Sequence, residues 1–276
     1  MPLFFVTLSY AQSNSSIQSA SANTVGTSTS QQSAQSISTP SFSLVIGLEY
    51  SEKIAEDEKG AKESGTDLVI SPAYKINHIF SSSITTVLSK SNNAAGETSV
   101  SDTQIGLGIK GFQIKESLVT LHSLSGVIPT SEKSKETDRL LGAFGISNGL
   151  RYKNDIAQFE YKLGFSKNVH EFNINANNSP NIEYRLSNTV EVQTNLSTKF
   201  SLVGVGVYRI GRTYGGKERT SFEVHGDLLY EVSGKMSLNL GTSNVGSALK
   251  MNGVDSNITA YNDDTSVIRA GVSITL

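Results

Sequence analysis

Apolar side chains recur at every second position from Ser41 to the C-terminal residue, and this alternation restricts the fold more than any other feature of the chain. In residues 41–51 the even-numbered positions from Phe42 to Tyr50 are all apolar or aromatic, and the odd-numbered positions are mostly small or polar. Successive side chains of a β-strand point to opposite faces of the sheet. A period of two therefore predicts a strand with one apolar face and one small or polar face.

The same pattern occurs in twelve segments, which predicts twelve strands and an all-β fold. Pro72 lies inside the second segment, where it removes a backbone donor and predicts a bulge or a local break in the pairing. The predicted strands are 41–51, 67–77, 80–90, 102–111, 118–128, 139–152, 156–167, 182–193, 199–210, 220–232, 236–244 and 265–276.

The connections between these segments alternate between long and short. The long connections are 52–66, 91–101, 129–138, 168–181, 211–219 and 245–264, and the short ones are 78–79, 112–117, 153–155, 194–198 and 233–235. A membrane barrel sorts its connections in this way, with tight turns on one side and longer loops on the other. An open sheet edge cannot stand in hydrocarbon, where backbone groups have no water to bind. The pattern predicts a single closed antiparallel up-and-down transmembrane β-barrel over residues 41–276, with short periplasmic turns and longer extracellular loops.

Aromatic residues near the strand ends support this interpretation, because membrane barrels carry aromatic girdles at both interfaces. The residues expected at the inner ends are Phe42, Tyr74, Phe80, Tyr152, Phe159, Phe200 and Tyr230, and those expected at the outer ends are Tyr50, Phe165, Tyr184, Tyr208 and Phe222.

Composition excludes several classes of protein and site. The formal net charge of −2 gives no basic surface for nucleic acid. The absence of Cys excludes disulfides, thiolate zinc sites and Cys nucleophiles. No run approaches the roughly 18 apolar residues of a membrane helix. The sequence predicts no cofactor and no metal.

The first forty residues are predicted to lie outside the barrel. Residues 1–11 contain a short apolar core and end in Ser-Tyr-Ala, as a cleavable signal peptide does, although no Lys or Arg precedes the core. In residues 12–39, 21 of 28 residues are Ser, Thr, Gln or Asn and none is charged. Such a segment cannot bury enough apolar surface to fold alone, so residues 12–40 are expected to form a flexible tether.

The architecture of residues 41–276 resembles that of bacterial outer-membrane β-barrel proteins. The last strand adds one local feature, because apolar residues stand at the last, third-last and fifth-last positions: Leu276, Ile274 and Val272. The resemblance implies that the outer-membrane assembly machinery reads this strand, although the family prefers a terminal aromatic residue to Leu276. It also implies a location in the bacterial outer membrane, with the lipid bilayer as a partner and the N-terminus in the periplasm.

If the apolar faces meet lipid, the opposite faces line the lumen. Glycines on that face, among them Gly241 and Gly271, are expected to leave room between charged side chains. The charged set is balanced between basic and acidic residues, which predicts either ion pairs across neighbouring strands or an eyelet with one basic and one acidic side. The candidate lumen residues are Glu49, Lys75, Asp102, Lys110, Arg139, Arg151, Glu160, Lys162, Glu183, Arg185, Glu191, Arg209, Glu223, Asp227, Glu231 and Arg269.

Three valines interrupt the pattern. Val203, Val205 and Val207 fall on the predicted lumen face, while Gly204 and Gly206 face lipid. This predicts a change of register near these residues or a plug that packs inside the barrel, and the register change is the simpler interpretation.

Enzymatic interpretations fit the sequence less well. Phospholipase-type barrels use Ser and His on one strand face with a polar orienting residue. The candidates for such a site in this sequence are His122, Ser123, Ser125 and Asn148. His122 and Ser123 are neighbours in sequence and point to opposite sides of a strand, and the His-x-Ser spacing would require Ser where Leu124 stands. His170 beside Glu171 is the only protease-type candidate and is expected to be a solvated loop histidine. No catalytic residue is predicted.

Other polar residues also have ordinary explanations. His78 in a tight turn and His225 on the lumen face lack ligand partners at metal spacing. Asp255, Asp263 and Asp264 lack the alternating spacing of a calcium loop and are expected to be solvated.

The sequence favours a passive or weakly selective porin-like channel for small polar solutes. Two alternatives stay open at this point: a plugged barrel that serves a structural or surface-interaction role, and a soluble exported β protein.

Overall fold

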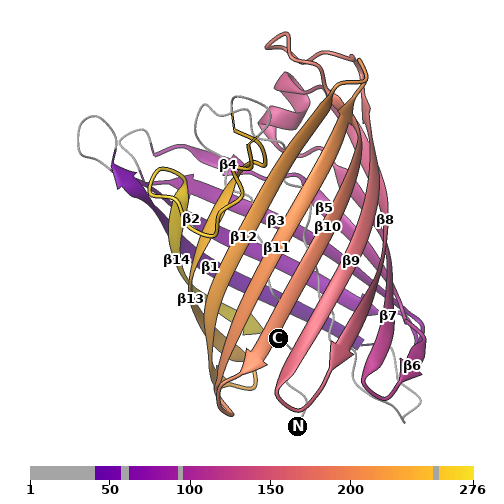
Figure 1. The fold of residues 1–276 in the computed structure, drawn as a ribbon, viewed down its shortest axis with the longest axis vertical. Coiled ribbons are helices and arrows are strands. Elements are labelled where there is room, and N and C mark those ends of the chain that lie inside the picture. Colours follow the sequence, from indigo (N-terminus) through magenta and orange to yellow (C-terminus); the bar gives the residue numbers. More distant parts are fainter. Residues whose placement is uncertain (1–40, 57–61, 93–95, 251–254) are drawn as a thin grey trace.

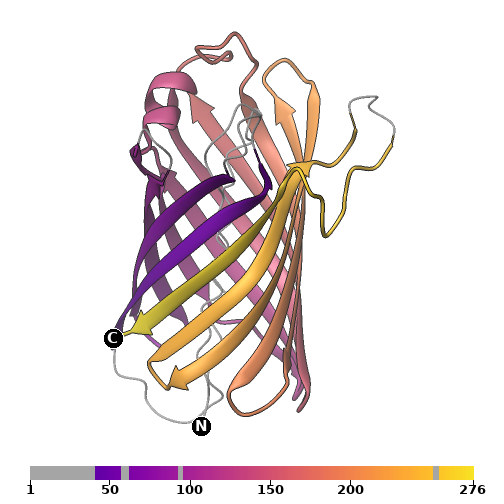
Figure 2. The same cartoon turned by 90° about the vertical axis from the view of Figure 1, so that its left-hand side faces the viewer.

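The computed structural model describes residues 41–56, 62–92, 96–250 and 255–276, and shows one closed antiparallel β-barrel (Figures 1 and 2). The predicted signal peptide and tether, residues 1–40, lie outside the described residues. The strands are β1 (Ser41–Glu56), β2 (Lys62–Lys75), β3 (Phe80–Ser91), β4 (Thr98–Val100), β5 (Thr103–Ile109), β6 (Gln113–Lys115), β7 (Leu118–Ile128), β8 (Leu140–Lys153), β9 (Ala157–His170), β10 (Ile182–Asn195), β11 (Phe200–Thr213), β12 (Glu218–Ser233), β13 (Met236–Ser247) and β14 (Ser266–Thr275).

These fourteen strands fill twelve positions in the wall, because β4, β5 and β6 follow one another along a single position beside β3 and β7. Each wall position pairs with the positions on both sides of it, β1 pairs with β14, and β2 pairs with β3, so the described strands form an unbroken ring. The predicted closed barrel of about twelve strands is confirmed. The described strands form this one sheet and no second sheet packs on it.

The side chains divide between the two faces as the alternation predicts. Phe144 on the outward face of β8 is 59% exposed, whereas Glu160 on the inward face of the adjacent strand is 1% exposed. The pairing of β1 with β14 sets Glu49 against Gly271 and Leu48 against Val272, so inward residues meet inward residues across the closure. An exposed apolar belt around a closed barrel is the surface that a bilayer covers. The part of the chain that the structure describes contains no helix long and apolar enough to cross a membrane.

Tight turns close the end of the barrel where β1 begins and β14 ends (Figure 2). In two of these turns an asparagine side chain accepts backbone hydrogen bonds: Asn77 from the N–H groups of Ile79 and Phe80, and Asn154 from those of Ile156 and Ala157. Asn forms such turns readily because its side chain reaches its own backbone two residues on. These contacts set the register of two hairpins at their inner ends.

Strand lengths at the outer end differ from the prediction. β1 continues to Glu56 and β12 begins at Glu218, so backbone pairing extends beyond the segment with apolar alternation. The predicted long connection at 211–219 is wrong: β11 and β12 are joined by a tight turn in which the N–H of Thr213 donates to the carbonyl of Lys217 and Gly216 has φ of +77°. Alternation disappears where strands leave the lipid, so periodicity cannot report this paired region.

Two of the outer connections have defined structure of their own. A short π-helix, η1 (Lys133–Thr137), forms in the connection before β8. The connection after β13 folds against the outside of the wall, where Asn244 donates to the carbonyl of Thr259 at 2.8 Å and accepts from the hydroxyl of Thr265 at 2.6 Å. Phe222, expected in the outer girdle, faces outward in this region but is only 2% exposed.

Pro72 interrupts the pairing without shifting it. The β2–β3 ladder lacks pairs at Ser71 and Pro72 and resumes in the same register at Ala73. The predicted local break is confirmed. The side chain of Ser71 compensates on the inward face by a 2.8 Å hydrogen bond to Thr85 of β3.

Candidate functional site: the charged lumen wall

Most of the charged residues predicted to line the lumen stand on inward-facing positions of strands. The strand residues of this set are Glu49, Lys75, Arg151, Glu160, Lys162, Glu183, Arg185, Glu191, Arg209, Glu223, Asp227, Glu231 and Arg269. Lys110, Asp102 and Arg139 lie just outside strand ends.

Asp102 and Arg139 have local explanations at the outer rim. The carboxylate of Asp102 accepts from the N–H of Ser131 at 3.0 Å and from the hydroxyls of Ser131 and Ser134 at 2.7 and 2.6 Å. It therefore anchors the connection that carries η1, a role that the sequence did not indicate. Arg139 is exposed and has φ of +51°, so its backbone makes the turn into β8.

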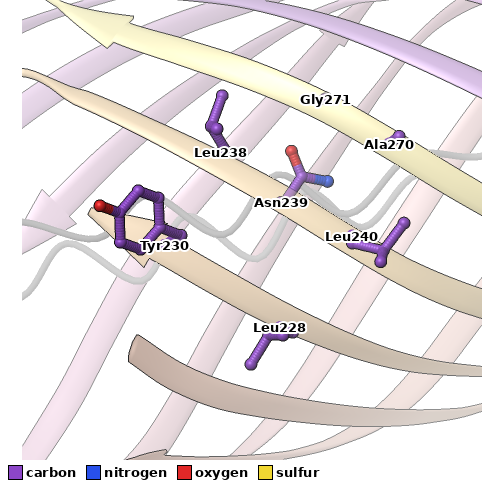
Figure 3. Close-up of a pocket in the computed structure, with 7 residues that line it drawn as sticks. All are labelled: Leu228, Tyr230, Leu238, Asn239, Leu240, Ala270 and Gly271. Atoms are coloured by element: carbon purple, nitrogen blue, oxygen red, sulfur yellow. The ribbon is translucent and has the colours of Figure 1, made fainter. Parts of the chain in front are cut away.

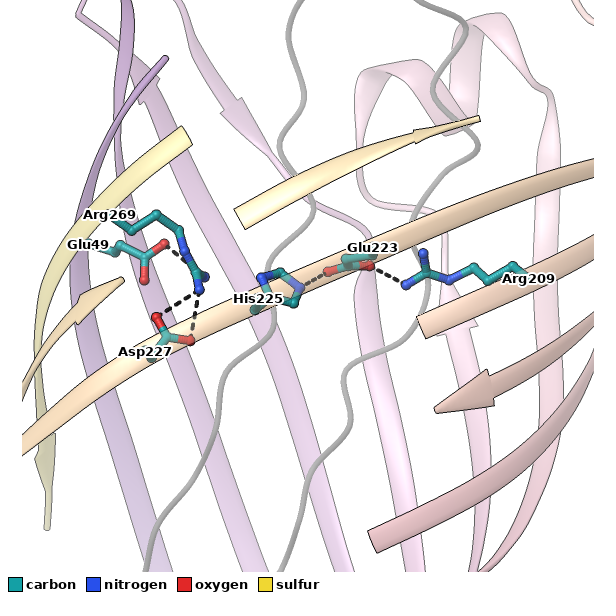
Figure 4. Close-up of polar contacts among 6 residues, drawn as sticks. All are labelled: Glu49, Arg209, Glu223, His225, Asp227 and Arg269. Carbon is teal, nitrogen blue, oxygen red and sulfur yellow. Dashed lines mark hydrogen bonds and ion pairs between the residues drawn. The ribbon is translucent and has the colours of Figure 1, made fainter. Parts of the chain in front are cut away.

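The first inward cluster joins β11 to β12. Glu223 lies between Arg209 and His225 and bonds to both (Figure 4). Glu223 is only 2% exposed. A buried carboxylate requires partners of this kind, because an unpaired charge in the interior carries a large desolvation cost.

The second cluster spans three strands at the closure of the barrel. A guanidinium nitrogen of Arg269 on β14 donates to both carboxylate oxygens of Asp227 on β12, at 2.8 and 2.9 Å, and the other terminal nitrogen lies 3.7 Å from Glu49 on β1 (Figure 4). Asp227 and Arg269 are not on adjacent strands, since Gly241 of β13 pairs with both of them. A Cβ at Gly241 would lie 2.0 Å from a carboxylate oxygen of Asp227.

Gly271, in the next inward row, likewise lies between two polar side chains that meet across it. It pairs with Asn239 on one side and Glu49 on the other, and the amide of Asn239 donates to Glu49 at 3.3 Å across it. A Cβ at Gly271 would lie 2.6 Å from the Asn239 side-chain oxygen. The lumen glycines here are bridging positions: polar side chains two strands apart meet above them. The sequence predicted that these glycines leave space between charged side chains, but it could not indicate which side chains occupy that space.

The third cluster lies on β8 and β9. One carboxylate oxygen of Glu160 accepts from Arg151 at 2.5 Å and from the amide of Gln158 at 2.8 Å, and the other forms an ion pair with Lys162 at 2.9 Å. The three clusters correspond to the predicted cross-strand ion pairs. Each cluster brings charges of both signs together: one acid contacts two cations on β8 and β9, and one cation contacts two acids at the closure.

The lumen face also carries an apolar strip. Val203, Val205 and Val207 are buried on the inward face of β11 and pack with Leu229. The ladders of β11 with β10 and with β12 hold one register through these residues, so the predicted register change is wrong. Gly204 and Gly206 accordingly face outward.

The residues considered for catalysis are distributed between the two faces. His122 and Asn148 pair across β7 and β8 on the outward face and are hydrogen-bonded at 2.7 Å. Ser123 faces inward and bonds to Ser147, so it cannot reach His122, as expected. His170 is not an isolated loop histidine, because it ends β9 and packs edge-on against Tyr214.

The remaining polar candidates also have local partners. His225 belongs to the Glu223 cluster, and Asp263 accepts from the hydroxyl of Tyr261 at 2.6 Å. This hydrogen bond raises the pKa of Tyr261, because the phenol donates to a carboxylate and loses that bond on ionisation. Among the described residues no group of three or more His, Asp or Glu is arranged to hold a metal ion.

A shallow pocket of about 360 Å³ lies on the wall formed by β12, β13 and β14 (Figure 3). Its lining is dominated by the outward side chains of Leu228, Tyr230, Leu238, Leu240 and Ala270, with Asn239 and Gly271 beneath them. An apolar depression on the outer belt suits an acyl chain and contains none of the charged clusters, so the candidate site is the lumen wall.

Solved structures of outer-membrane channels share this fold. The NanC porin aligns with a TM-score of 0.54 at 12% identity over 84% of this chain and 100% of its own. An outer-membrane channel from Pseudomonas putida F1 aligns with a TM-score of 0.56 at 10% identity over 87% and 97%. The KdgM porin, solved in complex with disordered oligogalacturonate, aligns with a TM-score of 0.50 at 8% identity over 83% and 98%.

No family model and no curated protein matches the sequence. At these identities the structural likeness establishes the fold: the chain is a bacterial outer-membrane type β-barrel, as its alternation predicted.

Proposed function

We propose that this barrel is a passive or weakly selective outer-membrane channel for small polar solutes. The observation that carries the proposal is the inward face, where charged and small side chains line the wall while the apolar belt faces outward. Ion pairs that neutralise one another give the wall polarity without a strong filter of one sign, which would require an excess of one charge. The structural neighbours, which were solved as porins and channels, support the same class of function.

A barrel of this size encloses more space than an eight-stranded barrel, whose side chains fill the interior, and less than the open porins of sixteen or more strands. We therefore expect a narrow pore. The proposal assigns no catalytic residue and no cofactor.

The test is the conductance of the purified, heat-modifiable protein in planar lipid bilayers. We expect discrete conductance steps and flux of small sugars or amino acids into vesicles that contain the protein. A folded barrel that shows neither current nor solute flux would overturn the channel.

The same experiment also tests the alternative in which the barrel is plugged. A variant that lacks residues 12–40 is measured beside the full chain. If only the shortened variant conducts, the full-length protein is a plugged barrel and the structural or surface-interaction role takes precedence.

A further inference from the structure

Arg185 differs from the other buried arginines of the lumen. It projects from the inward face of β10 and is only 4% exposed, yet its Nη1 atom has no hydrogen-bond partner within the described residues. Arg151, Arg209 and Arg269 are equally buried and each is paired with a carboxylate. Among the described residues, the wall therefore gives three of these guanidinium groups a carboxylate partner and leaves the fourth without a counter-ion.

The neighbours of Arg185 do not supply one. Its cross-strand partners are Ser166 on β9 and Gly211 on β11. The nearest acidic residue of β10, Glu183, stands at the bulge in the β10–β11 ladder, and its carboxylate lies 3.8 Å from the Nζ atom of Lys167. The closest charge on β11 is another cation, Arg209, which is diagonal to Arg185 in the ladder.

A guanidinium keeps its charge at any physiological pH, so Arg185 cannot relieve its burial by losing a proton. A neighbouring cation makes the uncompensated charge less favourable still. A carboxylate or phosphate group in the lumen would offset both effects, because the planar fork of arginine binds these groups through two parallel hydrogen bonds.

We infer that Arg185, with Arg209 beside it, forms a binding site near the outer mouth for the anionic group of a permeating solute. This rests on the proposed channel function and makes it more specific: the preferred solutes carry a carboxylate or a phosphate. Arg209 already holds Glu223, so Arg185 provides the free donors and Arg209 adds to the positive potential.

The reversal potential in a KCl gradient tests the site. We expect Arg185→Gln to lower the anion-to-cation permeability ratio about threefold, as the loss of one poorly screened charge predicts. Arg151→Gln removes the same charge from beside the carboxylate of Glu160 and should change the ratio much less. Arg185→Lys should keep the ratio but weaken block of the current by citrate, because lysine lacks the fork.

Equal ratios for Arg185→Gln and the parent chain would overturn the site and leave the channel intact. A second measurement does not depend on conduction. Inorganic phosphate should raise the heat-modification temperature of the parent chain and not that of Arg185→Gln, and an equal shift in both, which indicates an adventitious ion only, would also overturn the site.

The outward face of the barrel carries a row of polar side chains. His122, Asn148 and Asn188 lie on one row of the ladder across β7, β8 and β10, with Leu163 of β9 between the two asparagines. His122 is held by Asn148 at 2.7 Å and by Thr120 at 2.9 Å, and the oxygen of Asn188 accepts from the hydroxyl of Tyr161 at 2.8 Å. Elsewhere on the outward faces of the described strands, the one other amide, Asn244, is covered by the connection after β13.

This outward polar row leaves donors unused. The amide nitrogens of Asn148 and Asn188 donate no hydrogen bond within the described residues, and Asn188 lies midway along its strand, where lipid offers only acyl chains. Amide groups in that layer are unfavourable unless a protein partner satisfies them. Two such rows on identical barrels complement each other, because each asparagine has free N–H groups and an oxygen with a second lone pair.

We propose that the β7–β10 face is the contact between copies of this chain in the membrane. The chain has no cysteine, so single cysteines report the contact cleanly. In lipid vesicles, Leu163→Cys within the row should form disulfide-linked dimers, and Leu240→Cys on the outward face of β13 should not. Adding Asn148→Leu and Asn188→Leu to the first variant should remove most of the cross-linking. Equal cross-linking of the two cysteine variants, or no loss in the leucine variant, would contradict this interface.

Discussion

The substitution Gly111→Val is expected to prevent most of the chain from reaching the folded, heat-modifiable barrel. The backbone of residue 111 passes so close to β7 that a Cβ would lie 1.5 Å from the carbonyl oxygen of Thr120. Phe112 next to it is bonded to Thr120 through both its N–H and its carbonyl, at 2.7 and 2.9 Å, so neither strand can move away without losing the pairing. The two nearest obstructing atoms, the carbonyl oxygen and carbon of Thr120, belong to the backbone and cannot rotate away as a side chain can. We expect a cost above about 3 kcal/mol, at or beyond the upper end of ordinary overpacking.

The control for this prediction is Gly204→Val on β11. A Cβ at Gly204 would meet no atom within 4 Å, and the position faces lipid. This variant should fold as the parent chain does, to within about 0.5 kcal/mol. The measurement is the fraction of chain in the fast-migrating folded band after refolding into lipid vesicles. Equal folded fractions for the two variants would show that the approach at Gly111 does not restrict the barrel.

The architecture could be predicted from the sequence because lipid and lumen impose opposite requirements on alternate residues. The twelve wall positions, their inward and outward faces and the tight inner turns all follow from a period of two. The outer strand ends could not be predicted in this way, as the pairing of β1 up to Glu56 shows, because both faces of a strand meet water above the membrane.

The partners of the lumen residues required the register as well. Nothing in the sequence indicates that Arg269 reaches Asp227 across Gly241 and not an acid on an adjacent strand. The same limit applies to Arg185, which is one of several similar basic residues until the ladder shows that no carboxylate stands beside it. The outward row of His122, Asn148 and Asn188 comes from three strands and is recognisable only when they are aligned.

The substitution Glu223→Leu is expected to lower the stability of the barrel by about 3–5 kcal/mol, the cost of removing one partner from a buried ion pair. Glu223 bonds to Arg209 and His225, and all three side chains are at most 4% exposed. Leucine is similar in size, so the loss comes from the ion pair and hydrogen bonds that Arg209 and His225 lose more than from a cavity. The chain has no tryptophan, so urea unfolding is followed by gel mobility or far-UV circular dichroism.

Two further variants separate this electrostatic cause from general disruption of β12. Glu231→Leu changes an inward glutamate of the same strand that is half-buried and makes no ion pair in the described structure, and it should change stability by less than about 1 kcal/mol. The double variant Glu223→Leu/Arg209→Met replaces the whole pair with apolar side chains of similar volume and should recover at least about half of the loss. If the double variant is as unstable as Glu223→Leu alone, the broken ion pair is not the cause, and the packing of Glu223 within the lumen wall must account for the effect.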